Sequence, residues 1–352
     1  MSPPTESRPL SVLMLTSEWP RDAGHTAHFV RRQVRFLEAA GLKIEVLPFR
    51  GAKNPFKYAR AWFETRRRLA RGDFDLVHAQ FGQSALVAFP KRLPLVVTFR
   101  GDDLLGVVGR NGHPTRTGRV LQWLCRLAAR GADAIIVVSE HMTRHLNPGA
   151  RAPAGVHVIP SGIDFELFRP LAQEPARARL GLPADDRLIL FVGDPEDARK
   201  RYFLAQRAVD LLQNGTRARL LVAWRIPHAQ MPDYMAACDA LVFTSLQEGS
   251  PNAVKEALAC NLPVVSVPVG DVAERLQGIA GCELCVDERP ETIAAALARV
   301  LARNARIDGR SAVRQLDEQL LTQKVISIYR AAVNGASTRT APQLTAASPP
   351  TA

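Results

Sequence analysis

The chain has 352 residues, enough for two domains of ordinary size, and 47% of them are hydrophobic, which supports well-packed cores. A formal net charge of +12 and a sequence pI of about 10.1 imply anionic partners: nucleic acid, an anionic membrane surface or phosphate-bearing small molecules. No zinc-finger, helix-turn-helix or RNA-binding-sheet motif is present, so we expect no nucleic-acid partner, and no apolar run approaches the roughly 18 residues that span a bilayer.

Apolar runs typical of strands alternate with helical patterns along the chain, as in parallel doubly wound sheets. The first run, Ser11–Thr16, leads into a polar loop and then a helix from about His28 to Ala40, stopped at Gly41. Gly24 would let the backbone of this loop approach a diphosphate, and His25 or His28 would donate to it. A plain strand-to-helix connection explains the loop equally well, and it lacks the dinucleotide-binding glycine fingerprint.

The segment from Lys53 to Arg71 carries seven basic residues and one acid, Glu64, beside aromatic residues near helical spacing. A basic face next to aromatics suits contact with an anionic membrane. A surface crossover helix with its apolar side turned inward explains the same pattern and is slightly favoured.

Further strands are predicted along both halves of the chain, with the Gly- and Pro-bearing segment 160–170 between the halves. Those of the first half are Lys43–Leu47, Asp75–His78, Leu95–Thr98 and Ala134–Val138, and those of the second series are His157–Ile159, Ile189–Val192, Arg219–Ala223, Ala240–Phe243 and Val264–Ser266. Leu316 to Val333 forms a last amphipathic helix, and the Ala/Ser/Thr/Pro-rich residues beyond Asn334 are expected to be disordered.

We therefore expect an α/β protein with two Rossmann-like doubly wound parallel-sheet domains that face a ligand cleft. The predicted bounds are residues 1–165 for the N-terminal domain, 166–334 for the C-terminal domain and 335–352 for a disordered tail.

Three cations, Arg199, Lys200 and Arg201, follow the predicted strand Ile189–Val192. Such a cluster suits a diphosphate, whose negative charge grows when it becomes a leaving group. A solvated basic turn is the alternative, and we favour the phosphate site.

The segment from Glu248 to Glu256 is the most informative in the chain. Gly249, Ser250, Pro251 and Asn252 form a turn after a buried strand, and the turn opens a helix predicted over Ala253–Cys260. The free backbone N–H groups of a helix start attract anions and donate to sugar hydroxyls. The carboxylates of Glu248 and Glu256 can both reach one ligand that lies across the helix start. Taken by themselves, the two residues would be explained as surface acids at a helix cap.

The five cysteines form no disulfide framework, and their odd number favours a reducing compartment. Cys282 and Cys285 have the spacing of a metal or redox pair, but no second pair or nearby His completes a zinc site, so we expect no metal. The N-terminal residues lack the apolar core of a secretory signal. We expect a cytoplasmic protein, placed at the inner face of the membrane if the basic segment docks there.

From Val12 to about Tyr329 these motifs resemble the family-4 retaining glycosyltransferases of the GT-B fold, also called group 1. Residues 99–103 are similar to the family's Thr-Phe-His-Gly-x-Asp segment, with Arg100 in the His position; an Arg cannot act as a general base at neutral pH. Residues 160–170 resemble the Pro-Asn-Gly-Val-Asp…Phe-x-Pro signature, in which Asp164 and Phe168 are structural. Asp194 stands where typical members have an Arg after the glycine.

The resemblance implies a sugar transfer from a nucleoside-diphosphate sugar to an acceptor, with retained anomeric configuration and no metal ion or other cofactor. It implies a last helix that crosses back to the N-terminal domain, and a role in making cell-surface polysaccharide, glycolipid or glycoconjugate, with a saccharide or lipid-linked acceptor. The implied donor-binding residues are Gly24, Arg199, Lys200, Arg225, Ile226, Glu248, Ser250, Pro251, Asn252, Ala253 and Glu256. Acceptor-side candidates are His25, His28, Arg100 and Asp102, and the catalytic candidates are Glu248, Arg100 and Lys200.

Within this scheme Glu256 accepts from the ribose hydroxyls, Glu248 binds sugar hydroxyls near the anomeric carbon, and Lys200 holds the diphosphate. No second carboxylate is identifiable as a nucleophile. The expected mechanism is a front-face displacement in which the diphosphate helps to take the acceptor's proton.

Two other functions fit the same pattern. One is a nucleotide-sugar epimerase of this architecture, which needs no acceptor. The other is a two-domain protein that closes on a small polar ligand without chemistry.

Overall fold

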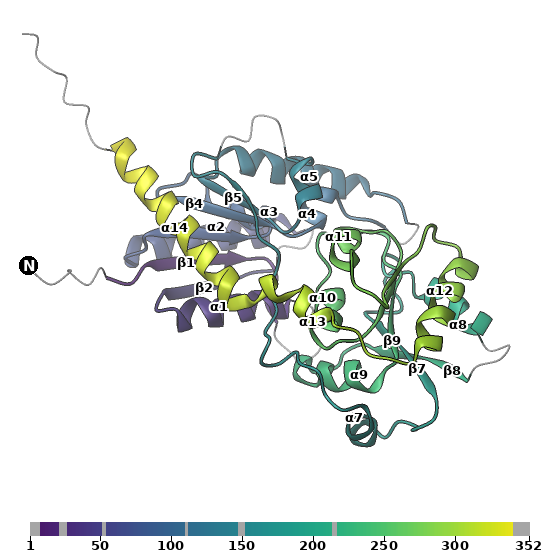
Figure 1. Cartoon of the computed structure of the whole chain (residues 1–352). Coiled ribbons are helices and arrows are strands. Elements are labelled where there is room, and N and C mark those ends of the chain that lie inside the picture. The colour runs from purple at the N-terminus through teal and green to yellow at the C-terminus, as the bar shows by residue number, and fades with distance from the viewer. Residues whose placement is uncertain are drawn as a thin grey trace, which may run out of the picture.

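The structure is a computed structural model that describes residues 8–20, 27–50, 54–109, 112–146, 152–212 and 217–340. Two parallel sheets with helices around them form two domains, and Figure 1 shows the chain passing from the first to the second and its last helix, α14, lying against the first. Both domains are therefore α/β, as the sequence predicts. Among the described residues, none of the helices combines the length and apolarity that crossing a bilayer requires.

The N-terminal sheet has six parallel strands in the order β2-β1-β3-β4-β5-β6. The strands are β1 (Ser11–Thr16), β2 (Lys43–Pro48), β3 (Leu76–Gln80), β4 (Leu95–Phe99), β5 (Ala134–Val137) and β6 (Val156–Val158). β3, β4 and β5 are buried along their whole length, which is why their sequences read as continuous apolar runs without alternation.

One prediction about this sheet is wrong. The strand near His157 was grouped with the second series, but β6 pairs with β5 and belongs to the N-terminal sheet. The Gly- and Pro-bearing segment follows it, so the chain completes the first sheet before it passes to the second domain.

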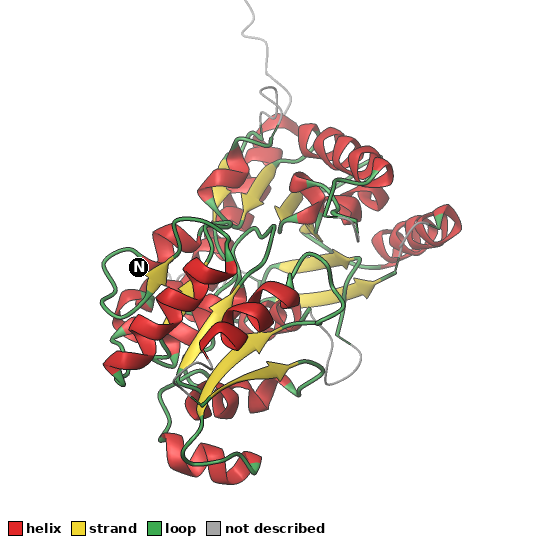
Figure 2. Ribbon diagram, turned by 90° about the vertical axis from the view of Figure 1, so that its right-hand side faces the viewer, coloured by secondary structure: helices red, strands yellow, loops and turns green. Residues whose placement is uncertain are grey.

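Helices cover both faces of the N-terminal sheet (Figure 2). They are α1 (His28–Ala39), α2 (Pro55–Arg71), α3 (Gly82–Ala85), the short 3₁₀ turn η1 (Leu86–Ala88), α4 (Asp102–Leu105), α5 (Arg116–Arg130) and α6 (Glu140–Thr143). α2 and α5 pack on one face, through Ala61 and Cys125 among others, and α1 packs on the other. The Asn54 side chain caps α2 by accepting from the Phe56 backbone N–H, and Pro55 fits the first turn because its missing N–H would have no partner there.

The C-terminal sheet has five parallel strands in the order β11-β10-β9-β7-β8. They are β7 (Arg187–Val192), β8 (Ala218–Ala223), β9 (Ala240–Phe243), β10 (Val264–Ser266) and β11 (Glu283–Leu284), the last too short to be predicted. The surrounding helices are α7 (Gln173–Leu180), α8 (Tyr202–Leu212), η2 (His228–Gln230), α9 (Met231–Ala237), α10 (Asn252–Ala259), α11 (Val272–Leu276), α12 (Pro290–Arg303), α13 (Gly309–Ala312) and η3 (Arg314–Leu316).

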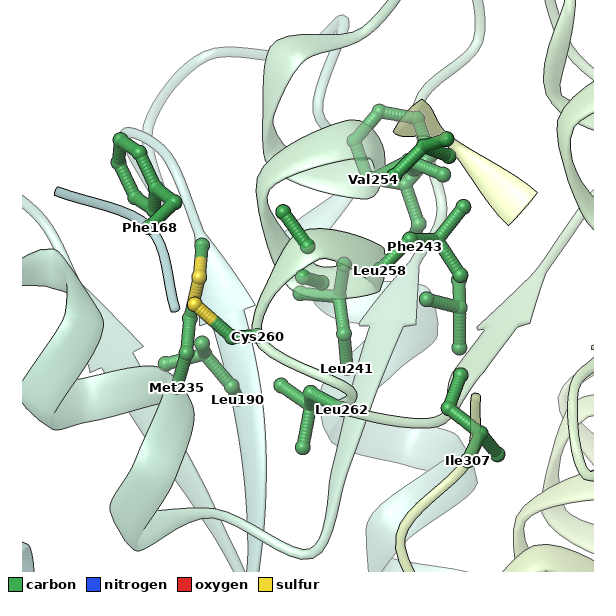
Figure 3. Close-up of a cluster of buried hydrophobic side chains, with 14 of the residues drawn as sticks. Phe168, Leu190, Met235, Leu241, Phe243, Val254, Leu258, Cys260, Leu262 and Ile307 are labelled. Atoms are coloured by element: carbon green, nitrogen blue, oxygen red, sulfur yellow. The ribbon is translucent and has the colours of Figure 1, made fainter. Parts of the chain in front are cut away.

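The helix α10 is anchored in the C-terminal core. Val254 and Leu258 of α10 belong to one buried cluster with Leu190 of β7 and Leu241 of β9, drawn in Figure 3, and none of the four exposes measurable surface. Close packing of this kind fixes the position of the helix, and therefore the direction in which its first turn points.

The last helix, α14 (Glu318–Thr340), crosses back to the N-terminal domain (Figure 1), as the resemblance implies. Leu321, Val325 and Tyr329 join the cluster formed with α1 under the first sheet. The helix continues past the predicted start of the disordered tail at residue 335. Composition suggested disorder there, but a helix that is already formed extends at little further cost.

Candidate active site

A cavity of about 480 Å³ lies between the domains, at the carboxyl ends of strands from both sheets. Open α/β sheets bind their ligands at such strand ends. The predicted site residues that line it are His28, Arg100, Asp102, Arg199, Lys200, Arg225, Ile226, Glu248, Ser250, Pro251, Asn252, Ala253 and Glu256. Gly24 and His25 lie outside the described residues.

The start of α10 is built to receive a polar ligand. Pro251 is the N-cap residue and provides no side-chain hydrogen bond to the helix, so the first-turn N–H groups are left without a side-chain cap. Ser250 Oγ and Asn252 Oδ1 are buried and have no hydrogen-bond partner among the described residues. Because buried polar atoms are normally paired, these two oxygens leave the helix start able to bind a polar ligand in the cavity.

Glu248 and Lys200 form an ion pair on the wall of the cavity. The Lys200 Nζ donates to Glu248 Oε1 at 2.6 Å, and the Lys200 ammonium lies 5.6 Å from the centre of the Phe243 ring. Burial raises the pKa of Glu248, but the charges of Lys200 and Arg199 outweigh burial and hold this pKa below its usual value. Glu248 is therefore a carboxylate at neutral pH.

Arg199 brings a second cation to the same wall. Its Nη1 lies 3.6 Å from Asp102 Oδ1 of the opposite domain, and its Nη2 lies 3.4 Å from Asp197 Oδ2. Burial lowers the pKa of Arg199, but Asp102, Glu248 and Asp197 raise it above its usual value. Two fixed positive charges thus stand beside the start of α10.

Glu256 is held by two residues that sequence reasoning missed. Arg32 of α1 donates to Glu256 Oε1 at 3.4 Å, and His228 Nε2 lies 3.2 Å from the same oxygen. Arg32 also donates to Glu318 Oε2 at 3.1 Å and to the Gly162 carbonyl. Burial raises the pKa of Glu256, but His228 and Arg32 together hold it below its usual value. No local pattern marks Arg32, because its acidic partners are 224 and 286 residues away.

Arg100, which stands at the His position of the segment that residues 99–103 resemble, is held in a polar network. Its guanidinium donates to Gln80 Oε1 at 2.6 and 3.0 Å, to Gln33 Oε1 at 3.0 Å and to Ser161 Oγ at 2.6 Å. It also lies 4.6 Å from the centre of the Phe29 ring. Burial lowers the pKa of Arg100 to about 10, so the group is still a cation at neutral pH and cannot serve as a base.

The neighbouring Asp103 is structural. Its carboxylate accepts the backbone N–H groups of Gly82, Arg100 and Gly101 at 2.9 to 3.1 Å, and so fixes the loop that carries Arg100. Asp164 and Phe168 are structural too, since Asp164 accepts from the Arg35 side chain and Phe168 is fully buried.

Lys255 is a further residue that the sequence did not single out. It is fully buried in α10 and donates to the Ser161 carbonyl at 2.8 Å. Burial lowers the pKa of Lys255 to about 7. This lysine ties the helix α10 to the segment between the domains.

Within the described ranges, no group of three or more His, Cys, Asp or Glu side chains is arranged to hold a metal ion. Burial raises the pKa values of Cys282 and Cys285 to about 11, which makes thiolates at these positions rare at neutral pH. The absence of a metal from the reaction stays a prediction.

Comparison with known proteins places the chain in a family. Residues 10–167 match the family model described as Glycosyltransferase Family 4, and residues 185–303 match the model described as Glycosyl transferases group 1. The putative teichuronic acid biosynthesis glycosyltransferase TuaC of Bacillus subtilis is 29% identical over 246 residues, which are 60% of this chain and 60% of that protein. The chain thus spans about 60% of the length of the curated relatives that it matches first.

Solved structures share the architecture. Sucrose-phosphate synthase from Thermosynechococcus elongatus superposes with a TM-score of 0.74 at 21% identity, over 92% of this chain and 98% of that one. The Anabaena protein HepE, solved with UDP and glucose, superposes with a TM-score of 0.62 at 16% identity, over 93% of this chain and 99% of that one. These identities establish the fold alone. With both family models matched in order along the chain, the protein belongs to the glycosyltransferases of family 4 and group 1, and its fold is GT-B.

Proposed function

We propose that the protein transfers a sugar from a nucleoside-diphosphate sugar, held at the start of α10, to an acceptor on the N-terminal domain, with retained anomeric configuration. The observation that carries the proposal is the pair of buried oxygens of Ser250 and Asn252, which have no hydrogen-bond partner among the described residues and line the same cavity as the cations Arg199 and Lys200. A molecule that joins an anion to hydroxyl groups would satisfy both features at once. HepE, whose fold is similar, has been solved with UDP-glucose.

In this proposal the two cations stabilise the diphosphate. Its negative charge increases as the bond to the sugar breaks, and positive groups fixed beforehand stabilise that charge without reorganisation. Lys200 would turn from Glu248 toward the phosphates, which frees the Glu248 carboxylate to accept from sugar hydroxyls. Arg225 and Ile226, at the end of β8, would contact the base, and Glu256 the ribose.

The residues at the reacting centre favour front-face displacement. Arg100 cannot take a proton, and Glu248 is kept ionised by its ion pair with Lys200. The bond between the anomeric carbon and the diphosphate oxygen would break as the acceptor oxygen bonds to the same carbon. The acceptor's proton would pass to the departing diphosphate, which needs no protein base and no metal ion in this scheme.

The acceptor, the pathway and the location belong to the same proposal. The B. subtilis relative is named for the biosynthesis of teichuronic acid. We propose a saccharide or lipid-linked acceptor in the assembly of a cell-surface polysaccharide or glycolipid, in the cytoplasm. The membrane contact predicted for residues 53–71 would bring the enzyme to such an acceptor; in the described part, α2 exposes Phe56 and Phe63.

A panel of UDP-glucose, GDP-mannose, ADP-glucose and dTDP-glucose, screened by thermal shift, tests the donor. One nucleotide class should raise the melting temperature, because a ligand at 100 times its Kd stabilises a fold by about 2.7 kcal/mol. Arg199→Ala should weaken that shift, whereas Arg217→Ala, exposed and outside the cavity, should leave it unchanged. No shift with any sugar nucleotide, in wild type at millimolar concentration, would remove the proposal.

A further inference from the structure

A second cavity, of about 1180 Å³, runs between α2 and α5 on the N-terminal domain. Tyr58 and Trp62 line it from α2, and Leu121 and Leu124 line it from α5. Val87 of η1 also lines it. We call this cavity the α2–α5 groove. Its lining is mainly apolar, so the chemistry that it can recognise is hydrocarbon.

The α2–α5 groove opens into the cleft between the domains. Glu18, Gln83, Val107 and Leu121 line both cavities. A molecule lying in the groove therefore has one end at the carboxyl edge of the N-terminal sheet, across the cleft from Lys200 and Glu248. That edge is where an acceptor must present its hydroxyl to the donor.

The outer rim of the groove is apolar and basic. Val120 of α5 lines the groove and is 59% exposed, and Phe56 of α2 and Trp123 of α5, each next in sequence to a lining residue, are 82% and 61% exposed. The cations Arg50 and Arg116 line the groove itself, and α5 contains no acidic residue. A rim of this kind suits an amphiphile that carries an anionic group.

We propose that the α2–α5 groove holds the hydrocarbon chain of a lipid-linked acceptor whose sugar-accepting end lies in the cleft. This inference rests on the proposed glycosyl transfer and names the class of its acceptor. A bilayer surface alone does not explain a concave groove that continues into the cleft. A second copy of the chain or a peptide would not need one end beside the donor site.

The test uses the full-length protein and farnesyl phosphate, below its micelle concentration, as the probe in isothermal titration calorimetry. Ala59→Trp fills the groove from an exposed position of α2, and Ala70→Trp is its matched control on the same helix outside the groove. Leu124→Gln makes the lining polar, with Leu127→Gln, 46% exposed, as its control on α5.

We expect saturable 1:1 binding of farnesyl phosphate to the wild type, tighter than any binding of inorganic phosphate, which has no hydrocarbon chain. Ala59→Trp and Leu124→Gln should weaken binding about tenfold, equivalent to about 1.4 kcal/mol. The control variants should bind farnesyl phosphate as the wild type does. All four variants should bind the sugar nucleotide identified in the thermal-shift panel with the affinity of the wild type, which would show that they are folded.

Three results would overturn the proposal. The first is no binding of farnesyl phosphate by a protein that binds its sugar nucleotide; the donor assignment would then stand without the groove. The second is evidence of docking on the surface of the protein instead of in the groove. Either Ala59→Trp and Ala70→Trp would weaken the binding of farnesyl phosphate equally, or the groove variants would lose only their adsorption to anionic vesicles. The third is a dimer that dissociates only in the groove variants, which makes the groove a contact between copies. Failure of the panel itself would instead count against the glycosyl transfer.

Discussion

Lys200 and Glu248 hold opposite charges in direct contact on a wall of the cleft, with 20% and 12% of their side chains exposed. Removing such a pair from water is costly, so its net contribution to stability is small. In the proposed reaction each partner has a second role, Lys200 toward phosphate and Glu248 toward sugar hydroxyls.

Replacing Lys200 by Met should lower the rate of nucleoside-diphosphate release from the sugar nucleotide. The loss of one fixed charge at a developing anion typically lowers kcat by about 100- to 1,000-fold. Lys43→Met, an exposed lysine on β2, is the control and should be unaffected. A Lys200→Met enzyme with a normal kcat would show that this lysine does not stabilise the leaving group.

Replacing Ser250 by Ala should separate binding from stability. The Ser250 hydroxyl is buried without a described partner, so its removal leaves the unliganded protein as stable as before or slightly more so. The sugar nucleotide should bind more weakly by about 1 kcal/mol, the usual worth of one neutral hydrogen bond. Equilibrium unfolding and calorimetry measure the two effects; an equal loss of stability without ligand would mean that the hydroxyl serves the fold.

Lys255 should make stability depend on pH above neutrality. Its pKa is about 7 in the folded chain and 10.5 when unperturbed, so between these values the unfolded chain binds the extra proton. Stability attributable to this residue therefore rises from pH 7 toward pH 10, with a slope that approaches about 1.4 kcal/mol per pH unit. Urea unfolding of the wild type and Lys255→Met across this range should give curves that diverge; parallel curves would contradict the assignment.

The residues that line the cleft were largely predictable because they follow strand ends and a helix start that are visible in the local sequence. Thirteen predicted residues line the cleft: His28, Arg100, Asp102, Arg199, Lys200, Arg225, Ile226, Glu248, Ser250, Pro251, Asn252, Ala253 and Glu256. Arg32 and His228 were missed because their importance comes from Glu256, which the fold brings to them. The hydrogen bonds that the Arg100 guanidinium donates to Gln80, Gln33 and Ser161 could not be predicted from the sequence either.

At the scale of elements, α14 joins the domains by packing a C-terminal segment under the N-terminal sheet. Tyr329 is fully buried, and its hydroxyl lies 2.5 Å from His78 Nδ1, while His78 Nε2 lies 2.8 Å from Thr98 Oγ1. Burial lowers the pKa of His78 to about 3, so the ring stays neutral and can both donate and accept.

Replacing Tyr329 by Phe should therefore destabilise the protein by about 1 to 3 kcal/mol, because it leaves the buried His78 Nδ1 with only a long contact, 3.5 Å from Gln80 Nε2. Tyr234→Phe is the control, since within the described residues its hydroxyl makes no side-chain hydrogen bond; we expect a change below about 0.5 kcal/mol. Denaturant unfolding measures both. Equal effects would show that the His78 contact contributes nothing to the docking of α14.

Elements with strong apolar patterns were predicted well, and the misses have physical causes. β1 was predicted with the bounds that it has, Ser11–Thr16. β6 was assigned to the wrong sheet because strand pairing is not a local property, and β11 has only two residues. α14 continues to Thr340, beyond the last residues of its apolar face, so the helix predicted from that face ends too early, at Val333.

At the scale of the whole molecule, the two domains contact each other directly around the cleft. Ser139 Oγ donates to the Gly249 carbonyl at 2.8 Å, and Gln247 Nε2 donates to the Gly106 carbonyl at 2.7 Å. Together with the ion pair of Arg32 and Glu256, these contacts fix the spacing of the two domains across the cleft, and in the proposed reaction this spacing sets the distance between acceptor and donor. Such positioning is the main contribution that a protein makes when the leaving group is already activated.

The two-domain α/β architecture followed from the alternation of strands and helices, but the closeness of the domains did not. Contacts such as Arg199 with Asp102 join segments far apart in sequence, and no pattern along the chain encodes their geometry. The α2–α5 groove was unpredictable for the same reason: residues 53–71 were interpreted as a surface crossover helix, and nothing along the chain indicated that α5 lies beside them.

A crystal structure of the protein with the sugar nucleotide selected by the panel tests the central claim most directly. We predict that the diphosphate lies at the first turn of α10, in contact with Lys200 and Arg199, with the sugar against Glu248 and polar contacts to Ser250 and Asn252. A nucleotide bound at another place, with the start of α10 in contact with solvent alone, would contradict the account.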